Sequence, residues 1–146
     1  MAKHISRIAA VQVMYQKDVT NADLEFIINN FVEQYAYEEE EYKKMHRGFF
    51  KRLISRIDTD IDLDEIINNN LNSDNKMKTA PLIMKSIIKV GIIEIIFERT
   101  VIPVIINEYV EIAKKFVGGG GVKVINAILD KISRQVERRC QIPTEM

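Results

Sequence analysis

Apolar residues recur every third or fourth position along most of this chain, which is the spacing of an α-helix and not of a β-strand. In the first segment Ile5, Ile8 and Val11 share one broad side of a helix with Tyr15. Isoleucine is abundant and would by propensity alone favour strands, but the period decides against them. The sequence therefore predicts an all-α fold.

We expect about seven helices in a single domain that spans residues 1–146, a length that can bury a core without a metal or a disulfide. Helical spacing marks the segments 5–15, 24–31, 38–57, 61–71, 79–97, 104–116 and 125–136. The segment 82–97 is apolar nearly all round and should lie centrally, with Gly91 allowing another backbone to approach. Gly118 to Gly121 should end the sixth helix and link it to the seventh.

Charge is balanced in total but uneven along the chain. There are 21 basic and 21 acidic residues, so net charge indicates no partner. From Met1 to Lys17 the Lys, Arg, Asp and Glu residues are all basic, from Asp18 to Glu41 all acidic, and from Lys114 to Arg139 mostly basic. These two basic ends are the candidate surfaces for a polyanion.

The sequence offers no catalytic or metal-binding pattern. His4 and His46 are far apart and outside any helical metal pair, and Cys140 is the only cysteine. Gly118 to Gly121 is followed by Val-Lys-Val, which does not match a phosphate-binding P-loop. We therefore expect no catalytic residue, no metal, no cofactor and no enzymatic activity.

No segment is typical of a membrane protein. The apolar stretch 82–97 is interrupted by Lys85, Lys89 and Glu94 and falls short of the roughly 20 apolar residues that span a bilayer. The first 15 residues lack the apolar run of a signal peptide. These observations favour a cytoplasmic protein without a membrane partner.

Two surfaces could bind nucleic acid. Lys3 and Arg7 are one helical turn apart and could meet adjacent phosphates, with the Tyr15 ring further along for base stacking. The spacing of Tyr15 favours the alternative that it is a core aromatic. A basic stripe on the last helix is the second surface, with plain solvated charge as its alternative, and consists of Lys131, Arg134 and Arg138.

Four motifs follow one another along the chain, namely RIAAVQVMYQ at 7–16, IIKVGIIEI at 87–95, INEYVEIAKKF at 106–116 and VINAILDKI at 124–132. In this order they resemble the bacterial transcription antitermination factor NusB family, and the first is similar to the family's first-helix signature. IIKVGIIEI at 87–95 resembles a helix in which the family has an arginine at the position of Lys89. INEYVEIAKKF at 106–116 and VINAILDKI at 124–132 are close to INEAVELAKxF and FVNGVLDKI. Together they extend across most of the chain.

The resemblance implies seven helices in two packed helical bundles and a non-enzymatic role. It implies that the protein binds the boxA RNA of ribosomal RNA leaders together with ribosomal protein NusE, within the RNA polymerase elongation complex that resists termination. Whether the protein forms a homodimer is left open. The RNA-binding residues that we predict are Lys3, His4, Arg7, Tyr15, Lys89 and Lys123.

Some residues depart from the family pattern. Gly118 to Gly121 replace acidic and serine residues, Val124 replaces an aromatic, and the N-terminal tip has few basic residues. We therefore expect weaker intrinsic RNA binding that depends more on NusE. One alternative is a helical protein-interaction adaptor without intrinsic RNA binding. Another, a piece of a ribosomal RNA methyltransferase, is disfavoured because the sequence has no glycine-rich cofactor segment.

Overall fold

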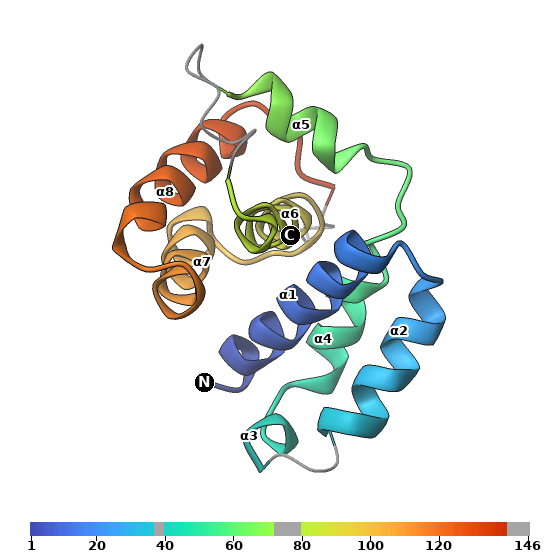
Figure 1. Cartoon of the computed structure of the whole chain (residues 1–146). Helices are drawn as coiled ribbons and strands as arrows, with labels where there is room; N and C mark the ends of the chain where they lie inside the picture. Colours follow the sequence, from blue (N-terminus) through green and yellow to red (C-terminus); the bar gives the residue numbers. More distant parts are fainter. Residues whose placement is uncertain (37–39, 72–79, 140–146) are drawn as a thin grey trace, which may run out of the picture. The chain divides into compact units, whose positions relative to one another are not determined.

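The computed structural model describes residues 1–36, 40–71 and 80–139, and every regular element in these ranges is helical (Figure 1). The chain divides into two compact units, an N-terminal unit of residues 1–61 and a C-terminal unit of residues 62–146. The prediction of an all-α fold is thus confirmed, with eight α-helices in the described ranges instead of about seven. The assignment of residues 1–146 to a single domain stays a prediction.

The N-terminal unit is organised around its first helix. Helix α1 contacts the other three helices of the unit, as the blue to green ribbons of Figure 1 show. A π-helical turn over Val32–Ala36 follows α2. The helices are α1 (Ala2–Thr20), α2 (Leu24–Phe31), α3 (Glu40–Lys43) and α4 (Arg47–Ile54).

Short polar residues set the helix ends in this unit. Asn21 ends α1 in the left-handed conformation (φ 52°), and its N–H donates to the Lys17 carbonyl. Asp23 then caps α2, since its carboxylate accepts from the Phe26 N–H at 3.2 Å. The segments 5–15 and 24–31 were therefore correctly predicted as separate helices.

The prediction of one helix through residues 38–57 is wrong, because the helix is interrupted at His46. His46 is extended (φ −81°, ψ 100°), and its Nδ1 caps α4 by accepting from the Phe49 N–H at 2.9 Å. The hydroxyl of Ser6 in α1 donates to the His46 carbonyl at 2.8 Å. A hydrogen bond across 40 residues thus stabilises the break, and Glu38 and Glu39 of the expected helix start lie outside the described residues.

The C-terminal unit is built around an apolar helix. Helix α6 contacts α5, α7 and α8, which surround it in Figure 1, and its buried residues lie on all sides. The expected central position of this segment is confirmed. Inside the unit the Tyr109 hydroxyl donates to the buried Glu94 carboxylate at 2.8 Å. The helices are α5 (Leu63–Asn69), α6 (Leu82–Phe97), α7 (Ile102–Phe116) and α8 (Gly119–Ser133).

Two predictions about glycines need correction. A Cβ at Gly91 would lie 3.1 Å from Leu129 Cδ2 and 3.5 Å from Tyr109 Cδ2, so the close neighbours are side chains of α8 and α7 and not another backbone. The glycine run is not a linker throughout. Only Gly118 takes a positive φ (87°), as the N-cap of α8, and the next three glycines belong to that helix.

Candidate nucleic-acid interface

Three cations converge on one buried aromatic ring in the N-terminal unit. Lys3 Nζ lies 5.2 Å from the centroid of the Phe49 ring, and the guanidinium carbons of Arg7 and Arg52 lie 5.0 and 5.7 Å from it. Phe49 itself is fully buried. The negative faces of such a ring attract cations at this range. We call Lys3, Arg7, Arg52 and Phe49 the Phe49 cluster.

The structure separates the candidate residues of α1 by exposure. Lys3 is exposed and His4 is half-buried, whereas Arg7 retains only 3% of its accessible surface. Helical spacing, which set Arg7 one turn from Lys3 as a possible phosphate contact, did not predict this burial. The helical spacing assumed a single buried side of α1, but α4 packs against this helix and places the Phe49 ring beside the Arg7 guanidinium.

Tyr15 is 39% exposed, although its spacing favoured a core position. Val19, one turn further along α1, is 55% exposed. The ring is thus accessible to a stacking partner, which the alternative of a core aromatic did not expect. Lys17, a further cation of α1, donates to the Ala22 carbonyl at 2.8 Å and holds the turn after α1.

Sequence reasoning missed the basic character of α4. Between Tyr42 and Ile57 the chain has six Lys or Arg residues and no Asp or Glu. This run of cations is visible in the sequence, but it lies between the two basic ends that were predicted as binding surfaces. Four of its members lie on exposed positions of α4 and the turn after it, namely Arg47, Lys51, Arg52 and Arg56.

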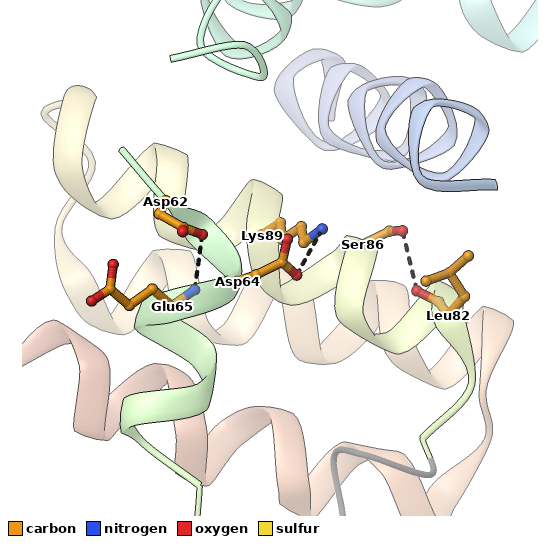
Figure 2. Close-up of polar contacts among 6 residues, drawn as sticks. All are labelled: Asp62, Asp64, Glu65, Leu82, Ser86 and Lys89. Atoms are coloured by element: carbon orange, nitrogen blue, oxygen red, sulfur yellow. Dashed lines mark hydrogen bonds and ion pairs between the residues drawn. The ribbon is translucent and has the colours of Figure 1, made fainter. Parts of the chain in front are cut away.

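Lys89 has a carboxylate partner in the C-terminal unit. Its side chain on α6 is 8% exposed, and Nζ lies 3.2 Å from Oδ1 of Asp64, whose side chain is 67% exposed. Figure 2 shows the two side chains pointing toward one another from α6 and the first turn of α5. Asp62 caps α5 by accepting from the Glu65 N–H at 3.0 Å, and this cap begins the turn that carries Asp64.

Lys123 is exposed and lies beside a groove of about 520 Å³ between α7 and α8. The groove is largely apolar, with two amides and one carboxylate among its polar groups. Its lining residues are Ile102, Pro103, Ile106, Asn107, Val110, Val122, Lys123, Asn126 and Asp130.

The basic stripe expected on the last helix is divided by its contacts. Arg134 forms an ion pair with Asp130 at 2.9 Å. Arg138 lies beyond the end of α8, and its guanidinium donates to the carbonyls of Ile95, at 2.7 Å, and of Glu98 and Thr100. Arg138 therefore attaches the segment after α8 to the C-terminal end of α6 by hydrogen bonds. Lys131 lies on α8 and is exposed.

Metal-binding and membrane-spanning features are absent from the part of the chain that the structure describes. Within residues 1–36, 40–71 and 80–139 there is no group of three or more His, Cys, Asp or Glu side chains placed to hold a metal ion. Cys140 lies outside these ranges. No helix in the same ranges combines the length and apolar character needed to cross a membrane.

The described residues define an all-helical protein with a cluster of cations on its N-terminal unit. The sequence model of the NusB family matches residues 4–134, which is most of the chain. Proteins called transcription antitermination protein NusB are similar over nearly their whole length. The relative from Rickettsia felis is 34% identical over 143 residues, covering 91% of this chain and 92% of its own. That from Rickettsia bellii is 33% identical, covering 93% and 92%.

This chain therefore belongs to the NusB family. A chain in a crystal structure of antitermination factors NusB and NusE in complex with dsRNA has the same fold. The TM-score is 0.70 at 18% sequence identity, and the match covers 92% of this chain and 98% of that one. At this identity the likeness establishes the fold alone.

Proposed function

We propose that this protein is a non-enzymatic transcription antitermination factor of the cytoplasm. It binds the boxA element of ribosomal RNA leaders together with ribosomal protein NusE, as part of the RNA polymerase elongation complex. The observation that carries the proposal is the family match over residues 4–134, together with relatives that are named as antitermination proteins. The Phe49 cluster supports it, because RNA affinity rests largely on cations that meet phosphates.

The six predicted RNA-binding residues remain a proposal, and their environments give them different parts in it. Lys3, Tyr15 and Lys123 are exposed and suited to direct contact with phosphates or bases. Arg7 is buried, so it contributes to the local field more than to direct contact, whereas the charge of buried Lys89 is neutralised by the Asp64 carboxylate. His4 is half-buried beside Lys3 in the sequence and adds a ring near the start of α1.

The test is a binding measurement with boxA-type RNA and with a scrambled RNA of the same composition, each with and without NusE. We expect the protein alone to prefer boxA-type RNA weakly and NusE to strengthen that binding, because the basic tip of α1 is small. Equal affinity for boxA-type RNA with and without NusE would contradict the cooperative part of the proposal. Equal affinity for the two RNAs under both conditions would contradict the boxA assignment.

A second candidate function is a helical adaptor that binds protein partners without intrinsic RNA binding. The groove between α7 and α8 favours it, because five of its lining residues are apolar and accept an apolar side chain of a partner. Binding of NusE in the absence of any measurable RNA binding would select this candidate.

A further inference from the structure

We propose that the outer face of α4 is a second phosphate-binding surface, which extends the contact of α1 along the RNA backbone. The proposal rests on the RNA binding proposed above and adds a helix to it. The residues that contact successive phosphates are Arg47, Lys51 and Arg52. None of these three was predicted as an RNA-binding residue from the sequence.

Helix α4 separates its apolar and its basic residues onto two sides. Phe49, Phe50, Leu53 and Ile54 form its buried side. On the other side, Arg47 and Lys51 are one helical turn apart and exposed, about 6 Å along the axis. Around the helix axis, Gly48 and Ser55 lie between Arg47 and Arg52 on this face. The His46 ring lies over Gly48, with its Cε1 3.3 Å from the position of a Cβ there.

Arg52 joins the outer face of α4 to α1. Its Nη1 lies 3.6 Å from the position of a Cβ on Gly48, and its guanidinium carbon is 5.7 Å from the Phe49 centroid. The same ring carries Lys3 at 5.2 Å. Lys3 of α1 and Arg52 of α4 are therefore grouped around the Phe49 ring.

The helix dipoles add to the positive potential of this group. The amino ends of α1 and α4 carry partial positive charge, and acidic residues in the first turn usually stabilise such ends. Neither helix has an acid in its first turn, while Lys3 and Arg47 stand there. This arrangement weakens both helix ends by a small amount, which a polyanion offsets when it binds.

The described acidic residues that precede α4 most closely in the sequence lie on α3. Helix α3, which also packs on α1, carries Glu40 and Glu41, and Glu40 forms an ion pair with Lys43 at 2.9 Å. From Tyr42 to Ile57 no further acid occurs in the sequence. The complementary partner is a phosphate backbone, bound without regard to base sequence.

The experiment measures the affinity of the full chain for the scrambled RNA at several salt concentrations. Replacing Arg47 and Lys51 together (R47Q and K51Q) should flatten the slope of log affinity against log salt by about 1.4, or about 0.7 for each phosphate that the variant no longer meets. The charge-preserving pair R47K and K51R should keep the slope. The matched control R99Q and K115Q also removes one exposed arginine and one exposed lysine, both in the C-terminal unit and neither among the predicted RNA-binding residues, and should keep the slope as well.

Each outcome is decisive for one of the proposals. An unchanged slope for R47Q and K51Q overturns the α4 inference, and so does the same flattening in the R99Q and K115Q control. If the pair weakens NusE capture and leaves the RNA slope unchanged, α4 is a protein-binding face and the inference is wrong. The ratio of boxA-type to scrambled affinity tests the proposed function separately, because phosphate contacts should leave that ratio unchanged.

Discussion

Cations in the two units lie beside different kinds of neighbouring group. In the N-terminal unit Lys3, Arg7 and Arg52 share the Phe49 ring, which attracts cations but carries no net charge. In the C-terminal unit Lys89 is buried and faces the Asp64 carboxylate at 3.2 Å. The ring itself brings no negative charge to its cations, whereas the carboxylate of Asp64 neutralises the charge of Lys89. We therefore expect local partners, more than the number of lysines, to decide which surface attracts RNA.

Of the predicted changes, removal of the Phe49 ring should have the largest effect on the free energy of unfolding. Phe49→Ala removes a fully buried side chain from α4, and we expect a loss of about 3–5 kcal/mol in the free energy of unfolding. Urea denaturation measures this loss. The matched control is Phe26→Ala on α2, where the ring is 60% exposed and the change should stay within about 0.5 kcal/mol. Similar losses for both variants would show that Phe49 does not organise the cluster.

The ion pair of the C-terminal unit should respond unequally to loss of its two partners. Asp64→Ala takes the carboxylate away from a buried ammonium, and we expect a cost of about 1–3 kcal/mol. Lys89→Met leaves only an exposed carboxylate, which water solvates, so the cost should stay below about 1 kcal/mol. Thermal unfolding of both variants checks the order. A larger loss of stability for Lys89→Met than for Asp64→Ala would contradict the idea that burial of the Lys89 ammonium determines the cost of breaking the pair.

The helices could be predicted from the sequence because their signals are local. The period of apolar residues located α1, α2, α5, α6 and α7, and the apolar character of α6 on all sides indicated its central position. The break at His46 could not be found in this way. It depends on the Ser6 hydroxyl, 40 residues away, which donates to the His46 carbonyl.

The candidate site was predictable only in part for the same reason. Helical spacing placed Lys3 correctly on an exposed face, but burial of Arg7 depends on the ring of Phe49 in another helix. Likewise, the motif at 87–95 indicated Lys89, while its partner Asp64 belongs to a different helix. A spacing rule describes one helix at a time and contains no information about the neighbour that packs against it.

The smallest expected effect is on the salt dependence of RNA affinity, in which Lys3 and Lys89 can be compared directly. If Lys3 contacts one phosphate, Lys3→Gln should flatten the slope of log affinity against log salt by about 0.7 on single-stranded RNA. Between 50 and 200 mM salt this corresponds to a change of about 2.5-fold in the salt sensitivity of the affinity. Lys89→Met should leave the slope unchanged, because its ammonium is buried against Asp64 and releases no counterion when RNA binds. Fluorescence anisotropy with scrambled RNA at four or more salt concentrations resolves the two slopes, and Lys115→Gln serves as the exposed control.

The single variant Lys3→Gln is preferable to a double change that includes Arg7, since Arg7 is buried and its loss would also affect folding. A flatter slope for Lys89→Met than for Lys3→Gln would reverse the comparison and move the phosphate-binding surface to the C-terminal unit.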